Sequence, residues 1–251
     1  MLDEVTITKA IVEDFMKTFV EYTNIDVAVA GAGPSGMVAA KYLADGGAKV
    51  AVFERKLSVG GGMWGGGMMF PRIVIQDGAK HILDDFEINY WEHKDGYFLA
   101  NSIEAVGKLV SKTIAAGAEI FNLMNVEDVV IRDKKIVGVV INWSAVELAK
   151  LHVDPLSVRS RVVIDGTGHE AEVCRIVERK IPGALKVVGE KPMWAEIGER
   201  FILDATKEVY PGLIVTGMAA NAVAGRPRMG PIFGGMMLSG EKAAKLALSK
   251  L

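Results

Sequence analysis

Three glycines and one glutamate are the residues whose types and spacing point most directly to chemistry. Gly31, Gly33 and Gly36 have the G-x-G-x-x-G spacing, and Glu54 follows them by roughly twenty residues. In a dinucleotide site the first glycine allows a tight turn, the second lets backbone amides approach a pyrophosphate, and the third lets a helix pack closely on a strand. The carboxylate accepts a ribose hydroxyl and repels a 2′-phosphate. The pattern therefore predicts a site for NAD or FAD rather than NADP.

A second group of residues could bind a metal ion. His169 follows the apolar run 162–164, and an open α/β sheet binds its ligands in the loops at the carboxyl ends of its strands. Asp154 lies in an irregular segment, residues 142–160, and could reach His169 only through the fold or from another subunit. A histidine and a carboxylate without a nearby cysteine suit divalent iron, manganese or zinc, although simple hydrogen-bonding roles fit the pair equally well.

Arg228 and Met218 lie in the last third of the chain. Arg228 precedes a glycine-rich start of a closing helix, expected over 238–248, where a guanidinium can bind a small carboxylate in bidentate fashion. A solvated arginine is the alternative. Met218 follows the last buried strand, residues 213–216. FAD enzymes of this fold usually have an aspartate at the matching place, so Met218 counts against flavin.

The glycines and Glu54 need a strand, a helix and a second strand around them. Residues 25–30 are rich in valine and alanine, which suits a buried parallel strand. The helix after Gly36 would point its amino end at the phosphates, and a second strand, residues 49–53, ends on Glu54. Because these parts occur in order, we favour a dinucleotide site over a simple glycine turn.

The flanking segments complete the expected fold. Apolar residues recur at helical spacing over 7–20, with Thr6 or Thr8 as a cap, and we favour packing of this helix on the core over a subunit contact. In the segment 60–69, which includes Gly62, we expect backbone close to a ligand rather than a flexible loop. Helices are expected over 77–88 and 102–116, a strand over 119–123, and hairpins over 90–99 and 126–141.

This order of elements predicts an α/β protein with a Rossmann-like dinucleotide-binding fold of the two-dinucleotide-binding-domain flavoprotein type, with inserted β-hairpins. We expect residues 1–251 to form a single domain, which begins with an amphipathic helix over about 1–24. In this layout Val126 would lie near the adenine.

Composition narrows the function classes. The net charge is −2, and the basic residues are scattered, so we expect no nucleic-acid partner. No leader and no apolar run long enough for a bilayer are evident, so we expect no membrane association and a cytoplasmic location. The single cysteine, Cys174, excludes an intrachain disulfide and a cysteine-based metal cluster.

Six motifs together resemble the thiamine thiazole synthase family in its archaeal, sulfide-dependent form. They are GAGPSG at 31–36, the pair Glu54-Arg55, GGGMWGGGMM at 60–69, HVDP at 152–155, DGTGHEAEV at 165–173 and RMGPIFGGMMLSG at 228–240. The resemblance covers nearly the whole chain. It implies iron-dependent synthesis of adenosine diphosphate thiazole from NAD, glycine and free sulfide, with release of nicotinamide. No hydride moves in such a reaction, which is consistent with a Rossmann fingerprint that lacks a flavin signature.

The resemblance also assigns roles to residues. The dinucleotide would be held, beside the glycines, by Ser35, Glu54, Arg55, Gly62, Val126 and Met218. Asp154 and His169 would bind Fe(II), one of them contributed by an adjacent subunit of a homo-oligomer, which the resemblance suggests is an octamer. Arg228 would bind the glycine carboxylate.

His152 stands where eukaryotic members of that family have a cysteine that gives up its own sulfur. Imidazole has no sulfur, so we expect free sulfide as a cosubstrate and repeated turnover. Because imidazole titrates near neutrality, His152 is also the best candidate in this loop for proton transfer. Three other functions remain open: a flavin-dependent oxidoreductase, a ribose-phosphate isomerase, and a noncatalytic NAD-binding module.

Overall fold

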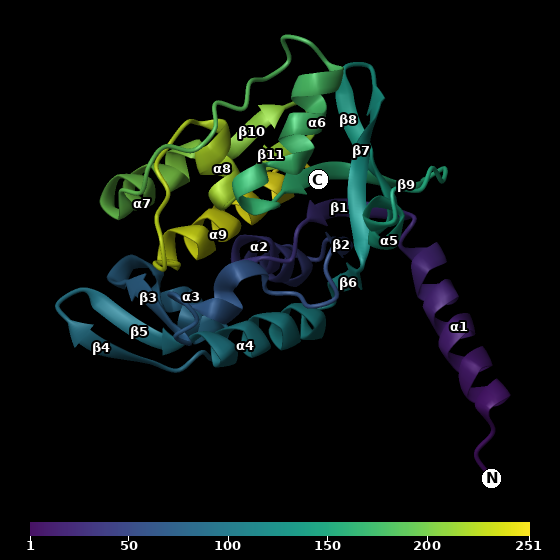
Figure 1. The fold of residues 1–251 in the computed structure, drawn as a ribbon, viewed down its shortest axis with the longest axis horizontal. Coiled ribbons are helices and arrows are strands. Elements are labelled where there is room, and N and C mark those ends of the chain that lie inside the picture. Colours follow the sequence, from purple (N-terminus) through teal and green to yellow (C-terminus); the bar gives the residue numbers. More distant parts are fainter.

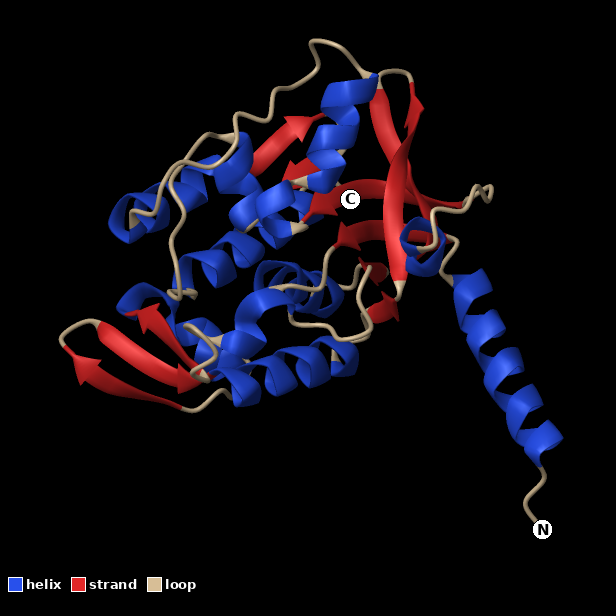
Figure 2. Cartoon of the chain, viewed as in Figure 1, coloured by secondary structure: helices blue, strands red, loops and turns tan.

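The computed structural model describes residues 1–251, and a mostly parallel sheet lies at its centre (Figures 1 and 2). In spatial order its main strands are β10 (Lys207–Tyr210), β11 (Leu213–Val215), β9 (Leu156–Asp165), β1 (Asn24–Ala30), β2 (Val50–Glu54) and β6 (Glu119–Asn122). Only the edge strand β10 is antiparallel among these. β1 has neighbours on both sides and helices over both faces, which explains its nearly continuous apolar sequence.

Two hydrophobic cores lie on opposite faces of this sheet. Val27 and Val29 of β1 point into one core, and Ala28 and Ala30 point into the other, as expected for alternating side chains in a strand. The first core is covered by α2 (Pro34–Asp45), α4 (Ser102–Ala115), α7 (Ala195–Ala205) and α9 (Gly234–Leu248). The second is covered by α6 (Glu172–Lys180), α8 (Met218–Val223) and the long hairpin of β7 (Met124–Arg132) and β8 (Lys135–Trp143).

A second, antiparallel sheet lies beside the first core. It contains β3 (Arg72–Gln76), β5 (Tyr97–Asn101) and β4 (Tyr90–Lys94), and it is joined by η2 (Asp77–Ala79) and α3 (Lys80–Asp85). Both expected hairpins are confirmed. The chain before α9 runs along β3, since the N–H of Val74 donates to the carbonyl of Pro231 at 3.1 Å and the N–H of Phe233 donates to that of Val74 at 2.8 Å. The expected α/β, Rossmann-like fold class is therefore confirmed.

The N-terminal helix differs from our expectation in its cap and in its packing. α1 (Glu4–Glu21) is capped by Asp3, whose carboxylate accepts the N–H of Thr6 at 2.7 Å. None of its residues is buried, and it projects away from the body of the molecule (Figure 1). The favoured core packing was therefore wrong. Only its last turns reach the body, where Phe15 and Phe19 contact Phe121.

Two further boundaries also differ from the sequence-based expectation. The irregular segment is shorter than predicted, because β8 extends to Trp143, α5 (Ser144–Leu148) follows, and β9 already begins at Leu156. The closing helix begins at Gly234 rather than Leu238, because two glycines allow its first turn to pack tightly against neighbouring side chains. No helix in the structure combines the length and the apolarity needed to cross a membrane.

Candidate functional site

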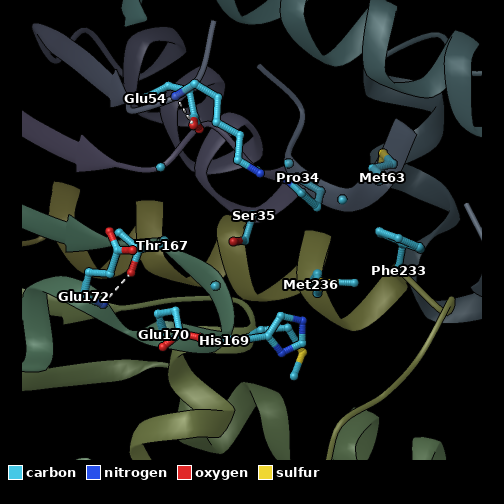
Figure 3. Close-up of a pocket in the computed structure, with 18 of the residues that line it drawn as sticks. Pro34, Ser35, Glu54, Met63, Thr167, His169, Glu170, Glu172, Phe233 and Met236 are labelled. Atoms are coloured by element: carbon cyan, nitrogen blue, oxygen red, sulfur yellow. Dashed lines mark hydrogen bonds between the residues drawn. The ribbon is translucent and has the colours of Figure 1, made fainter. Parts of the chain in front are cut away.

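A cavity of about 660 Å³ opens at the carboxyl ends of the central strands. Its walls include the ends of β1 and β2, the loop after β9 and the first residue of α8. This is where an open α/β sheet binds ligands, and the volume lies within the usual range of ligand pockets. In Figure 3, Glu54 and His169 lie on opposite sides of the cavity, with Ser35 between them.

The three fingerprint glycines have the distinct roles that the spacing predicts. Gly31 has a φ of +94°, and a Cβ there would lie 2.6 Å from the carbonyl oxygen of Gly166. A Cβ on Gly36 would overlap the carbonyl oxygen of Gly31, so the start of α2 packs directly on the end of β1. In contrast, no atom lies within 4 Å of a Cβ on Gly33, which lines the cavity. Gly33 therefore leaves space in front of the amino end of α2.

This difference predicts opposite effects for two alanine substitutions. Gly36→Ala should destabilise the fold by about 1–3 kcal/mol, because backbone must move to admit the methyl group. Gly33→Ala should leave stability unchanged and weaken binding of a dinucleotide, since the methyl group occupies the free space. Denaturant unfolding and calorimetric titration with NAD would measure both effects. Equal unfolding midpoints for Gly36→Ala and the unmodified protein would contradict the assigned packing role.

Glu54 is buried at the end of β2 and lines the cavity. Its Oε2 accepts the N–H of Ala32 at 2.9 Å, and its Oε1 accepts the N–H of Lys56 at 2.9 Å. These two bonds fix the carboxylate beside the glycine loop. Because each carboxylate oxygen can accept a second hydrogen bond, Glu54 can still accept a ribose hydroxyl.

The other residues expected at the dinucleotide also line the cavity: Ser35, Arg55, Gly62, Val126 and Met218. Gly62 belongs to η1 (Gly61–Gly65), so backbone of the glycine-rich segment does face the cavity. Gly217, which precedes Met218, packs directly against Ser35. It has a φ of +63°, and a Cβ there would overlap the Ser35 hydroxyl. The fingerprint residue Gly36 does not line the cavity, because it packs the helix on the strand.

Arg55 forms an ion pair with Glu172, the first residue of α6. Burial raises the pKa of the Glu172 carboxyl, and the neighbouring guanidinium of Arg55 partly opposes that rise. Sequence reasoning missed Glu172, since nothing in its local pattern distinguishes it from other acidic residues at a helix start. The pair keeps Arg55 at the cavity rim, where a ligand phosphate could compete with Glu172.

His169 and Arg228 line the polar end of the cavity, and both lie near Glu190, a residue outside the lining that we did not predict. His169 lies in η3 (Gly168–Glu170), and its Nδ1 is 2.7 and 2.8 Å from the two carboxylate oxygens of Glu190. Nε of Arg228 is 4.0 Å from Glu190. Glu190 therefore connects the two functional candidates. Glu190 lies in a segment without helical or strand periodicity, so the sequence alone did not indicate a functional role for it.

His152 and Asp154 lie outside this cavity. Both are exposed on the loop 149–155, where Nδ2 of Asn142 donates to the carbonyl of Val153 at 3.1 Å. The structure contains no group of three or more His, Cys, Asp or Glu side chains arranged to hold a metal ion. One chain thus brings together His169, Arg228 and the dinucleotide residues, but does not add His152 and Asp154 to them.

The parallel sheet, the glycine turn before α2 and Glu54 at the end of β2 define a Rossmann-like α/β protein. More specifically, the chain belongs to the Thi4 family, whose model matches residues 8–233. The resemblance expected from the motifs is thereby confirmed.

Individual relatives extend the match to the whole chain. A thiamine thiazole synthase of Methanococcoides burtonii is 64% identical over 255 residues, which cover 100% of this chain and 99% of the relative. A thiamine thiazole synthase of Pyrococcus furiosus is 56% identical over 252 residues, which cover 100% of this chain and 99% of the relative. The crystal structure of Thermovibrio ammonificans THI4 superposes with a TM-score of 0.97 at 49% identity, covering 99% of this chain and 98% of that one.

A more distant structure, a geranylgeranyl bacteriochlorophyll reductase-like protein of Thermoplasma acidophilum, has a TM-score of 0.61 at 16% identity over 90% of this chain and 78% of the other. This similarity concerns the fold alone.

Proposed function

We propose that this protein is an iron(II)-dependent adenosine diphosphate thiazole synthase in thiamine biosynthesis. Its substrates would be NAD, glycine and free sulfide, and it would release nicotinamide over multiple turnovers. The observation that carries the proposal is a single cavity lined by Gly31, Gly33, Glu54, His169 and Arg228. Glu54 and His169 lie on opposite sides of it (Figure 3). Membership in the Thi4 family supports thiazole synthesis as the outcome.

The adenosine half of NAD fits the side of the cavity near β1 and β2. The free space at Gly33 admits the pyrophosphate to the amino end of α2, where unpaired N–H groups favour an anion. Glu54 has lone pairs left for the ribose hydroxyls, and its charge disfavours a 2′-phosphate. NAD bound in this way would extend its nicotinamide ribose toward His169.

Arg228 is suited to the glycine carboxylate. Its side chain is 53% exposed, and its only carboxylate neighbour, Glu190, is 4.0 Å from Nε. At this distance the guanidinium is loosely held, so its terminal nitrogens remain available for two parallel hydrogen bonds to a carboxylate. Arg228 would thereby hold the amino group of glycine near the ribose carbon with which it condenses.

The donor set at this end of the cavity fits iron(II) in part. Because Nδ1 of His169 faces Glu190, its Nε2 is left as the nitrogen for a metal, an arrangement common to histidine ligands. Asp154 of a second subunit would supply the carboxylate, since the loop 149–155 is exposed. Bound iron would act as a Lewis acid that stabilises negative charge during enolisation.

The residues of the chain then have separate tasks in the reaction. Glu54 and the glycine loop orient the dinucleotide, Arg228 orients glycine, and Glu190 fixes the ring of His169. His152, on the same exposed loop as Asp154, would exchange protons with the substrate when that loop meets the cavity of another subunit. We also propose a cytoplasmic location, because Fe(II) and sulfide both persist only in reducing surroundings.

Anaerobic incubation of the protein with Fe(II), NAD, glycine and sulfide, followed by mass analysis, tests this proposal. We expect an adenylated thiazole and one nicotinamide per product, with neither formed when any component is omitted. Flavin absorbance near full occupancy in the purified protein would instead support an oxidoreductase. Turnover of a ribose phosphate without NAD or glycine would support an isomerase.

We further propose a homo-octamer in which α1 contacts a neighbouring subunit. Apart from Phe15 and Phe19, which contact Phe121, its large apolar side chains are exposed, including Ile11 at 65% and Val20 at 62%. Such a surface usually marks an interface. Ile11→Glu should therefore shift the sedimentation coefficient toward smaller species and leave the fold of the subunit intact. The matched control is Lys9→Glu in the same helix. A sedimentation pattern unchanged by Ile11→Glu would count against this interface.

A further inference from the structure

Two buried oxygen atoms without hydrogen-bond partners lie behind the wall of the cavity. They are Oε1 of Gln76, at the end of β3, and Oε1 of Glu199, in α7. The two side chains contact each other, since Nε2 of Gln76 donates to Oε2 of Glu199 at 2.6 Å. Buried polar atoms nearly always have partners in folded proteins, so this pair points to a role beyond packing.

The pair rests on the first turn of α9. The Glu199 carboxylate lies against the backbone of Gly235, whose N–H favours its ionised form. A Cβ on Gly234 would overlap the Gln76 amide, and a Cβ on Gly235 would overlap the Glu199 carboxylate. Both side chains are therefore in direct contact with helix backbone at an amino end, where a negative charge is favourable.

The same turn carries part of the cavity wall. Phe233 precedes the two glycines and Met236 follows them, and both side chains line the cavity (Figure 3). The backbone of Phe233 is also bonded to Val74 of β3, two residues before Gln76. A shift of this turn relative to β3 and α7 would consequently move Phe233 and Met236.

Burial raises the pKa of Glu199 to about 7, against the opposing effect of its bonds from Gln76 and Gly235. No charged side chain contributes to this rise. α8 has no charged residue, and Glu196 and Asp204 of α7 are exposed. The other charged side chains nearby have contacts elsewhere: Arg72 with Pro71, Asp77 with Lys80, Arg200 with Phe201, Glu241 with Lys245 and His81, and Lys242 with Leu203. Glu199 thus exchanges a proton near neutral pH.

We propose that Glu199 is a positioning residue for the cavity, which in its ionised form fixes the first turn of α9 through Gln76 and the N–H of Gly235. Protonation weakens the attraction between the carboxyl group and the N–H of Gly235 because the acceptor loses its charge. A proton on Oε1 of Glu199 also supplies a hydroxyl donor that Oε1 of Gln76 can accept, while Nε2 of Gln76 keeps its bond to Oε2. The two unpaired oxygens are thereby explained as the donor and the acceptor of a hydrogen bond that the protonated form can make.

Hydrogen exchange in the ligand-free protein tests this directly. Between pH 6 and pH 8, after correction for intrinsic exchange rates, protection of the amides of residues 234–237 should rise at least about threefold. In Glu199→Gln, the neutral isostere, protection should stay at the low value at both pH values. Glu196→Gln, an exposed glutamate of the same helix, should behave as the unmodified protein does. Equal profiles for Glu199→Gln and the unmodified protein would overturn the proposal.

Thermal unfolding provides a check that also shows whether the variant folds. The pKa of Glu199 is raised in the folded state from 4.5 to about 7, so the folded protein binds the proton more tightly than the unfolded chain. Its stability therefore falls as the pH rises from 4.5 through 7. Glu199→Gln lacks this loss, and its melting temperature should exceed that of the unmodified protein by several degrees at pH 8 and by little at pH 4.5. An equal difference in melting temperature at pH 4.5 and pH 8 would show that Glu199 does not titrate in this range.

Binding of NAD separates this inference from the proposed function, on which it rests for the identity of the ligand. Because a change of pH can alter NAD binding in every variant by other routes, the informative quantity is the ratio of dissociation constants, Glu199→Gln to unmodified, at each pH. We expect this ratio to increase at least about threefold from pH 6 to pH 8. Absence of NAD binding in the unmodified protein, with the expected exchange profile, would refute the proposed function and leave the positioning role in place. NAD binding with a constant ratio would refute the positioning role.

Discussion

Replacement of either His169 or Asp154 by alanine should abolish iron-dependent product formation and leave NAD affinity within about twofold. We expect a loss of at least about a hundredfold, since even residues that only orient metal ligands contribute about 10- to 100-fold. NAD affinity should persist, because Glu54 and the glycine loop are held by backbone bonds that involve neither residue. Product analysis and calorimetric NAD titration measure the two effects. Full activity in either variant would show that the metal assignment is wrong.

Mixing the two inactive variants tests the shared site. Within one chain His169 lies in the cavity and Asp154 does not, so an intact hybrid site needs one of each from different subunits. If subunits exchange randomly, roughly one quarter of the sites in a one-to-one mixture should regain both ligands. Activity near one quarter supports the arrangement. No recovery after demonstrated subunit exchange would indicate that both ligands come from the same chain.

Product yield should depend on added sulfide and should exceed one per subunit, while the mass of the chain stays unchanged. The reason is that His152 stands on the loop where a sulfur-donating cysteine would be needed, and Cys174, the only cysteine, is fully buried in α6. Burial and the nearby Asp165 carboxylate raise the pKa of the Cys174 thiol, so little thiolate is available. Product quantification against sulfide and intact-protein mass spectrometry check this.

The control for that experiment is Cys174→Ala, which should retain full sulfide-dependent turnover. A small residue is suitable there because the site is apolar and buried. Product formed without sulfide, together with loss of the mass of hydrogen sulfide from the chain, would instead identify Cys174 as the donor.

Much of the fold followed from the sequence because its signals are local. The glycine spacing, the valine-rich strand before it and the turns at Lys94-Asp95-Gly96 and Asp133-Lys134 each act over a few residues, and the structure has the corresponding elements. Gly31, Gly33, Glu54 and His169 could be placed at one site because the strand ends of a parallel sheet converge. Ser35, Arg55, Gly62 and Met218 were added only by the resemblance of the motifs to a known family.

What the sequence did not reveal depends on contacts between distant parts of the chain. Glu190 meets His169 from 21 residues away, and Gln76 meets Glu199 across 123 residues. No local pattern marks either pair. The packing of α1 was predicted wrongly for a related reason: an apolar helix stripe has the same periodicity whether its partner is the chain's own core or another molecule.

The isolation of α1 has a consequence for how the protein comes together. An 18-residue helix that rests on the body only by its last turns has marginal stability in water, because helix nucleation is unfavourable and tertiary packing supplies most of the stability of helices in proteins. Its folding should therefore be coupled to association. Dilution below the dissociation constant of the oligomer would melt this segment first. Helical content, and not only molecular mass, should therefore fall with concentration.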